Sequence, residues 1–305
     1  MRLAALSDLH HPESGVDLAG LAAQARAQNV DAVVLVGDAV SQFHPPLLSE
    51  VFAALREAAP IRAYVPGNHE LWRKEGSAGH VYGRALPALC EAEGWHYLDS
   101  GPLVVKDVAL VGNIGWYDGS LTDRETFPDF PVALGAMNIL KAMKGAPCQT
   151  IPLKDVTNAQ LAEKSLVVVP PPELAEKGFK PALLRWMDSK WVRLGVTDEE
   201  FTADCARRLG EHLAEASNKA DRIVVATHMA PFAAALGKPQ NPVEALVRAY
   251  QGASVLGERI LESRKVALCV YGHRHRPGVA QVEHLPVINV TARPDRGGTL
   301  VVRDV

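Results

Sequence analysis

The chain has 305 residues, of which 48% are hydrophobic and 22% charged, and its 32 Lys and Arg residues against 35 Asp and Glu leave a formal charge of −3. These proportions are ordinary for a packed globular protein of one large or two modest domains. They exclude collagen-like and disordered chains, and the missing basic excess argues against stable binding to duplex nucleic acid.

Membrane and secreted proteins are also disfavoured. The apolar runs Ala32–Val36 and Leu166–Val169 are far shorter than the roughly 20 residues that span a bilayer. Asp8 interrupts the N-terminus before an apolar signal-peptide core could form. The four cysteines include no CxxC pair, which favours thiols in a reducing compartment over a zinc ribbon. We therefore expect a cytoplasmic protein without a membrane partner, while the oligomeric state stays open.

The first 115 or so residues alternate short apolar runs with amphipathic segments. Strands are predicted at Leu3–Leu6, Asp31–Val36 and Ile61–Val65, and helices at Val16–Gln28 and Pro46–Ala59. Strands that alternate with helices at this spacing indicate βαβ units and a largely parallel sheet.

Residues from about 118 to 195 break this pattern, because the segment is rich in proline. Proline lacks a backbone donor and restricts φ, so neither a regular sheet nor a long helix is expected there. We predict a single domain over residues 1–305 that carries an irregular insertion at about 118–195. Such an insertion either lies beside a binding site or is a surface excursion without a role.

The last third returns to regular structure. Thr197–Glu200 has the spacing of a capping box, and Phe201, Cys205, Leu209 and Leu213 follow on one helical face. Further strands are predicted at Arg222–Ala226, Val266–Tyr271, Val279–Val282, Pro286–Val290 and Thr299–Val302. The Gly and Pro residues between them suggest hairpins, so we expect mixed sheets.

Five short polar motifs each follow a predicted strand. They are Asp8-Leu9-His10, Gly37-Asp38, Gly67-Asn68-His69-Glu70, Thr227-His228 and Gly272-His273-Arg274-His275. Each motif alone has an ordinary structural explanation, such as a turn or a helix cap. Because ligands bind at the carboxyl ends of strands in open α/β sheets, we expect the five motifs to meet in space.

Their residue types suit a binuclear metal site. Carboxylate, imidazole and amide ligands without thiolate favour Mn, Fe, Ni, Co or Zn. Asp8 and His10 are two residues apart, as are His273 and His275, and on extended backbone each pair would point the same way. The preceding glycines would let the chain turn sharply. Two ions about 3.5–4 Å apart would form a clamp for phosphoryl transfer.

The motif set SDLH, GDAV, GNHE, TH and GHRH resembles the calcineurin-like metallophosphoesterase superfamily, in particular its bacterial phosphodiesterase and phosphatase branch. The resemblance implies an α/β fold, a four-layer αββα sandwich with two mixed β-sheets flanked by helices. It also implies that one metal is held by Asp8, His10, Asp38 and His275. Asp38 would bridge to a second metal held by Asn68, His228 and His273, and His69 would be catalytic.

The implied reaction is phosphoester hydrolysis, in which a hydroxide bridging the two metals attacks phosphorus in line and His69 assists the leaving oxygen. Two divalent transition-metal ions are expected, with manganese the first choice. Glu70 is a candidate to orient His69. Ser41 stands where many members carry a second acid, which affects a contact behind the ligands.

We favour a phosphodiesterase acting on small or nucleotide esters. A phosphomonoesterase of the same mechanism is the first alternative. A non-catalytic scaffold of the same fold, with the proline-rich insertion as its docking surface, is the second. The sequence assigns no substrate-binding residues.

Overall fold

The computed structural model describes residues 1–292 and 300–305. Its first large sheet has the strand order β15-β1-β2-β3-β4. Strands β1 (Arg2–Leu6), β2 (Ala32–Val36), β3 (Ile61–Val65) and β4 (His96–Tyr97) run parallel, and β15 (Val301–Asp304) pairs antiparallel with β1. The predicted strand Thr299–Val302 is described only from residue 300 onward, because Thr299 lies outside the described residues.

The second large sheet has the order β13-β14-β12-β11-β6-β5. Its central strands are parallel and comprise β6 (Val108–Asn113), β11 (Arg222–Thr227), β12 (Val266–Tyr271) and β14 (Leu285–Asn289). Both edges, β5 (Leu103–Val105) and β13 (Gly278–Val282), pair antiparallel. Both large sheets are therefore mixed, as predicted.

The two sheets pack face to face through small apolar side chains. Val34 and Val65 of the first sheet join Leu110, Val224 and Val270 of the second in one buried cluster. Burying each such side chain stabilises the fold by roughly 1.5–3 kcal/mol. Fully buried strands explain why these segments read as continuous apolar runs.

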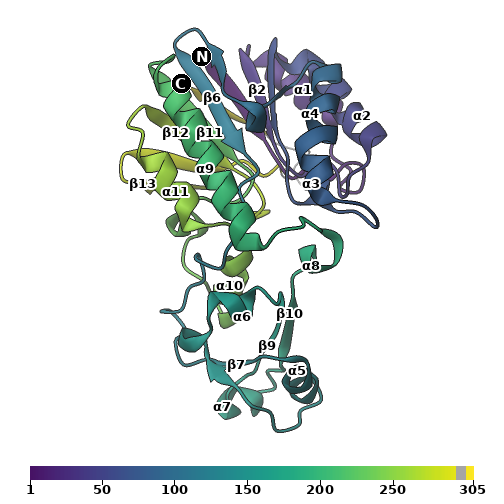
Figure 1. Cartoon of the computed structure of the whole chain (residues 1–305), viewed down its shortest axis with the longest axis vertical. Helices are drawn as coiled ribbons and strands as arrows, with labels where there is room; N and C mark the ends of the chain where they lie inside the picture. The colour runs from purple at the N-terminus through teal and green to yellow at the C-terminus, as the bar shows by residue number, and fades with distance from the viewer. Residues whose placement is uncertain (293–299) are drawn as a thin grey trace.

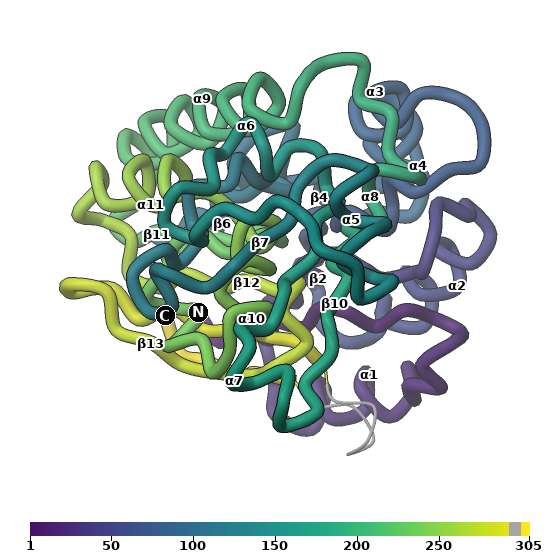
Figure 2. Tube along the Cα trace, turned by 90° about the horizontal axis from the view of Figure 1, so that it is seen from below, coloured from purple at the N-terminus to yellow at the C-terminus, as the bar shows by residue number. Residues whose placement is uncertain are grey.

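Helices cover the two outer faces (Figure 1). Figure 2 shows α1 (Leu18–Ala27), α2 (Pro45–Leu55), α3 (Ala78–His80) and α4 (Leu86–Glu93) on one side of the molecule, with α9 (Asp198–Ser217) and α11 (Ser254–Leu261) on the other. The chain is thus an αββα sandwich, which confirms the predicted fold class. No helix within the described ranges combines the length and the apolar character needed to cross a membrane.

The longest helix, α9, begins at the predicted capping box. The Oγ1 atom of Thr197 accepts a hydrogen bond from the N–H of Glu200 at 3.1 Å, and the Glu200 carboxylate accepts one from the N–H of Thr197 at 2.9 Å. Phe201, Cys205 and Leu209 are buried along one face of the helix. The capping residues and the apolar spacing therefore agree on where this helix starts and which face it buries.

The prediction that the proline-rich segment lacks a regular sheet is wrong. Strands β7 (Pro131–Ala133), β8 (Ile151–Pro152), β9 (Ser165–Val168) and β10 (Ala182–Arg185) form a small antiparallel sheet in the order β10-β9-β7-β8. Pro131 is the first residue of its strand and Pro152 lies on an edge strand, the positions that tolerate proline.

Short helices complete this segment: α5 (Ala136–Met143), α6 (Asn158–Leu161), α7 (Pro172–Ala175) and α8 (Asp188–Trp191). Figure 1 shows the small sheet below the sandwich, with β10 leading back to it through α8. The remaining helix, α10 (Pro242–Val247), lies between the sandwich and this sheet (Figure 1).

Candidate metal centre

The structure brings all seven predicted ligands together where the carboxyl ends of strands from both sheets meet. One group of ligand atoms comes from Asp8, His10, Asp38 and His275, and a second from Asp38, His228 and His273, each group lying within 4.8 Å. Oδ1 of Asn68 lies 3.2 Å from Nε2 of His228 and so joins the second group. Asp38 belongs to both groups.

The two carboxylate oxygens of Asp38 have different surroundings. Oδ1 accepts a hydrogen bond from the backbone N–H of His69 at 3.0 Å. Oδ2 is buried without a hydrogen-bond partner in the described parts of the chain, 3.4 Å from Nε2 of His228 and 3.8 Å from Nε2 of His10. A buried carboxylate oxygen without a partner is costly. A metal ion held by either group would satisfy this oxygen, and Asp38 belongs to both groups, so the donor set fits two metal ions.

In the first group, hydrogen bonds hold Asp8 in place. Its Oδ2 accepts from Ser7 Oγ at 2.5 Å and from Thr291 Oγ1 at 2.7 Å. Its Oδ1 lies 3.4 Å from Nε2 of His275, and that nitrogen lies 3.2 Å from Nε2 of His10. One carboxylate oxygen and two imidazole nitrogens therefore converge on one point.

In the second group, backbone carbonyls orient the histidines. Nδ1 of His228 lies 2.9 Å from the carbonyl oxygen of Val36, and Nε2 of His273 lies 3.2 Å from that of Tyr250. A ring nitrogen that donates to a carbonyl carries the proton, which leaves the other nitrogen as a metal ligand. His228 thus offers Nε2, and His273 offers Nδ1.

Five of the seven candidate ligands have left-handed backbone. The φ values are 57° for Asp8, 43° for His10, 50° for Asp38, 66° for His273 and 54° for His275. This conformation costs of order 1–3 kcal/mol for a residue with a Cβ, and such residues cluster at functional sites. The positive φ values of Asp8, His10, His273 and His275 show that the expectation of extended backbone is wrong. Asp8 and His10 still belong to one ligand group, whereas His273 and His275 belong to different groups.

The glycines before the ligands act in two ways. Gly37 has a φ of 81°, and a Cβ there would lie 2.4 Å from Nδ1 of His228. At Gly67 the φ is not in the left-handed region, but a Cβ would lie 2.1 Å from Oδ1 of Asp38. Gly67 is therefore needed for close approach of two loops and not for a turn.

Glu70 joins the loops after β2 and β3. Its buried carboxylate accepts from the N–H groups of Asp38 at 2.9 Å, Gly67 at 2.6 Å and Val40 at 3.1 Å. Burial raises the pKa of Glu70 to about 7, while hydrogen bonds from Gly67 and Val40 act to lower it. The sequence makes Glu70 a candidate to orient His69, but its carboxylate makes no hydrogen bond to the His69 side chain. Its oxygens are occupied by the backbone donors of the two loops.

His69 is held instead by Ser41. Nδ1 of His69 lies 3.0 Å from the Ser41 carbonyl oxygen, and the ring stacks on Trp72 with a centroid distance of 3.8 Å. If Nδ1 donates to that carbonyl, Nε2 is the nitrogen available to a bound substrate. The side chain of Ser41, which stands where many members of the resembled family carry an acid, donates to Glu13 at 2.9 Å.

A cavity of about 320 Å³, here called the metal-site cavity, opens beside the ligands. It is lined by Asp38, Asn68, His69, Trp72, Arg185, Trp186, Met187, Asp188, His273, Arg274 and His275. Residues 185–188 come from the end of the proline-rich segment, so the insertion lies beside the site and forms one of its walls.

Asp188 is a residue that the sequence analysis missed. Its fully buried carboxylate accepts from Asn68 Nδ2 at 2.9 Å, Trp72 Nε1 at 2.5 Å, Tyr117 OH at 3.0 Å and Trp186 Nε1 at 2.9 Å. Holding the Asn68 amide nitrogen turns its oxygen toward His228. A lone Asp at the start of a short helix offers no signal for this contact network in the sequence.

Burial and neighbouring charges shift the pKa values of three ligands in the second group. Burial acts to raise the pKa of Asp38, but His228, His69 and His10 hold it well below its ordinary value. Burial acts to lower the pKa of His228, and Asp38 raises it to about 9. Burial, together with the charge of His228, lowers the pKa of His273 to about 4. The second group thus pairs one carboxylate with one cationic imidazole, and a metal ion would replace that proton.

Comparisons with known proteins agree with this architecture. A sequence model described as calcineurin-like phosphoesterase matches residues 1–277. No curated protein sequence matches the chain. A phosphopantetheinyl hydrolase from Mycobacterium tuberculosis has a similar structure, with a TM-score of 0.61, 16% identity, and coverage of 97% of this chain and 90% of the other. A dimetal phosphatase from Danio rerio aligns with a TM-score of 0.50, 13% identity and the same coverage of 97% and 90%. At these identities the likeness shows the fold.

Proposed function

Since the chain belongs to the calcineurin-like phosphoesterase family and is a metal-dependent phosphoesterase, we propose that it hydrolyses phosphodiesters of small molecules or nucleotides. Two divalent transition-metal ions are the proposed cofactors, because the donor set has carboxylate, imidazole and amide groups without thiolate, which suits Mn, Fe, Ni, Co or Zn, and Mn²⁺ is the first choice. The proposed setting is the cytoplasm, with a small phosphoester as the partner and no stable duplex nucleic acid.

The observation that carries this proposal is the position of Asp38. Its buried Oδ2, which has no hydrogen-bond partner among the described residues, lies 3.4 Å from Nε2 of His228 in one ligand group and 3.8 Å from Nε2 of His10 in the other, as a bridging ligand would. Asp8, His10 and His275 would complete one site, and Asn68, His228 and His273 the other. Two bound ions would neutralise negative charge on the phosphoryl group and lower the pKa of an attacking water.

His69 is the proposed proton donor to the leaving oxygen. Its ring lines the metal-site cavity without belonging to either ligand group. Stacking on Trp72 and the Nδ1 contact with Ser41 keep the ring from rotating, so Nε2 stays directed toward the substrate. A positioned general acid of this kind contributes about 10²–10⁴ to a rate.

A diester is preferred over a monoester because of the room around the ligands. A diester carries a group on both sides of phosphorus. The metal-site cavity of about 320 Å³ shares Arg274 with a further cavity of about 200 Å³. Trp186 and Met187 give the first cavity an apolar wall that an esterified organic group could contact.

The test compares an aryl phosphodiester with an aryl phosphomonoester on chelator-stripped protein, each with and without added Mn²⁺. We expect Mn²⁺ to restore turnover and the diester to have the higher kcat/KM. A higher kcat/KM for the monoester would replace the diester preference by the monoesterase alternative. A phosphopantetheinyl diester belongs in the panel because the Mycobacterium tuberculosis protein of similar fold is named a phosphopantetheinyl hydrolase.

A further inference from the structure

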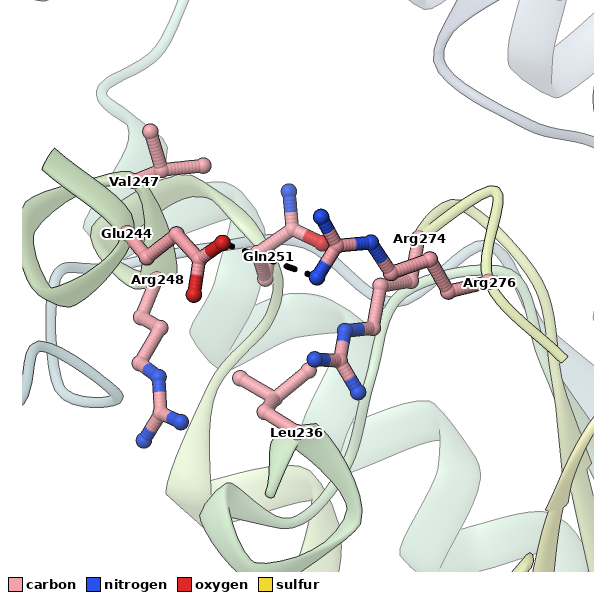
Figure 3. Close-up of a pocket in the computed structure, with 7 residues that line it drawn as sticks. All are labelled: Leu236, Glu244, Val247, Arg248, Gln251, Arg274 and Arg276. Atoms are coloured by element: carbon pink, nitrogen blue, oxygen red, sulfur yellow. Dashed lines mark ion pairs between the residues drawn. The ribbon is translucent and has the colours of Figure 1, made fainter. Parts of the chain in front are cut away.

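A second cavity of about 200 Å³, here called the arginine cavity, borders the metal-site cavity. Helix α10, the 3₁₀ turns Ala233–Leu236 and Arg248–Tyr250, and the loop between β12 and β13 contribute to its wall (Figure 3). It is lined by Leu236, Glu244, Val247, Arg248, Gln251, Arg274 and Arg276. Arg274 lines both cavities, so the two spaces are neighbours.

Arg274 and Arg276 give the arginine cavity a positive charge that the protein only partly balances. Arg274 donates to the carbonyl oxygen of Ala235 at 3.4 Å and forms no ion pair within 4.0 Å in the described ranges 1–292 and 300–305. Arg276 is 65% exposed and faces Glu244 at 3.5 Å, the ion pair drawn in Figure 3. Glu244 lines this cavity together with Arg274 and Arg276, and its carboxylate can neutralise only one of the two guanidinium groups.

The third arginine that lines the cavity, Arg248, is already paired within the protein. Its side chain donates to the Gly237 carbonyl oxygen and lies 3.5 Å from Asp123. Figure 3 shows its guanidinium group directed away from those of Arg274 and Arg276. Burial lowers the pKa of Arg248; Asp123 acts to raise it, and the charge of Arg274 to lower it further. Arg248 is thus paired with Asp123, and the positive charge of the cavity comes from Arg274 and Arg276.

Gln251 lines the arginine cavity but is only 9% exposed, and its Oε1 is buried without a hydrogen-bond partner among the residues that the structure describes. Because that oxygen is closed to solvent, an anionic ligand in the cavity would be bound by the guanidinium groups of Arg274 and Arg276.

We propose that the arginine cavity binds a second anionic group of the substrate, a phosphate or carboxylate carried on a group esterified to the scissile phosphorus. This inference rests on the phosphodiesterase function proposed above. Guanidinium groups bind such oxyanions through paired N–H donors. The volume is roughly six to seven times the ~30 Å³ that a water occupies in the liquid, which accommodates the anion with a short part of its carrier.

The substrate test uses two matched diesters, 2-carboxyethyl 4-nitrophenyl phosphate and propyl 4-nitrophenyl phosphate, with the Mn²⁺-loaded protein. The readout is the ratio of their kcat/KM values in wild type, in Arg276→Gln and in Arg303→Gln, an exposed arginine outside both cavities. We expect a ratio of about ten or more for wild type and Arg303→Gln, since one charge-assisted hydrogen bond supplies about that factor. Arg276→Gln should bring the ratio to within about twofold of one.

A second readout does not depend on turnover. Calorimetry with inorganic phosphate on the metal-free protein should give binding that Arg276→Gln weakens about tenfold or more and Arg303→Gln leaves unchanged. Equal wild-type kcat/KM values for the two diesters, or a wild-type ratio in Arg276→Gln, would overturn the anion site. If neither diester is hydrolysed, the proposed function fails, and the calorimetry alone decides the cavity: equal phosphate binding in Arg276→Gln and wild type then overturns it.

Discussion

The backbone N–H of His69 donates a 3.0 Å hydrogen bond to Oδ1 of Asp38. This bond ties the loop after β3 to the loop after β2 and occupies one of the two carboxylate oxygens. The other oxygen, Oδ2, is left for both groups. The backbone of His69 therefore prepares Asp38 to bridge, while its side chain is free for a separate role in the reaction.

His69→Ala should separate these two roles. The variant keeps the backbone N–H that holds Asp38, so its metal content should stay near that of wild type. Loss of the proton donor should lower kcat by about 10²–10⁴. Metal analysis and steady-state kinetics on one preparation check both statements. His80→Ala, at an exposed histidine outside the ligand groups, is the control. Full activity of His69→Ala would show that His69 is not the acid.

Asp188→Asn should weaken the fold and the second ligand group together. The carboxylate accepts two hydrogen bonds on each oxygen, and the amide nitrogen of Asn would face two of those donors. Buried donors left without an acceptor cost about 1–3 kcal/mol each. Unfolding of the metal-free protein should therefore occur at lower denaturant concentration.

The matched control is Asp129→Asn, an exposed carboxylate of the same insertion that pairs with Lys154. It should change stability by less than about 1 kcal/mol. Mn²⁺ titration should also show weakened binding in Asp188→Asn, because Asn68 loses the contact that orients its amide. Unchanged stability and unchanged Mn²⁺ affinity would mean that Asp188 does not position Asn68.

Gly67→Ala should impair the metal centre without unfolding the chain. The added Cβ would lie 2.1 Å from Oδ1 of Asp38, so one of the two loops must move. We expect Mn²⁺ affinity to fall at least about tenfold, since small displacements of ligands are costly at a metal site. Gly83→Ala is the control, because a Cβ there meets nothing within 4 Å. Wild-type Mn²⁺ affinity in Gly67→Ala would contradict the close packing of these loops.

Much of the sandwich was predictable because local patterns and packing agree there. Strand Val266–Tyr271 is a run of mostly apolar residues that ends at a glycine, and helix α9 has both a capping box and a four-residue apolar repeat. The five motifs were placed at one edge because each follows such a strand. Their convergence therefore follows from sheet topology and needs no knowledge of side-chain packing.

The insertion was not predictable in the same way. Its strands are two to four residues long, too short to show an alternating pattern, and the two prolines within them, Pro131 and Pro152, stand at strand ends where proline is tolerated. Asp188 contacts Asn68 across 120 positions of sequence, and no local pattern reports such a contact. The left-handed backbone of His273 and His275 is likewise a result of tertiary packing.

The most direct test of the binuclear centre is the number of metal ions bound per chain in wild type and in Asp38→Asn, measured after stripping with chelator, reloading with Mn²⁺ and removal of free metal. Asp129→Asn serves as the control for a loss of negative charge. With Asp38 as the bridge, wild type and the control should bind about two ions per chain. Asp38→Asn should lose both ions, because it removes a ligand common to the two groups. Two ions retained in Asp38→Asn with wild-type affinity would contradict a shared bridge.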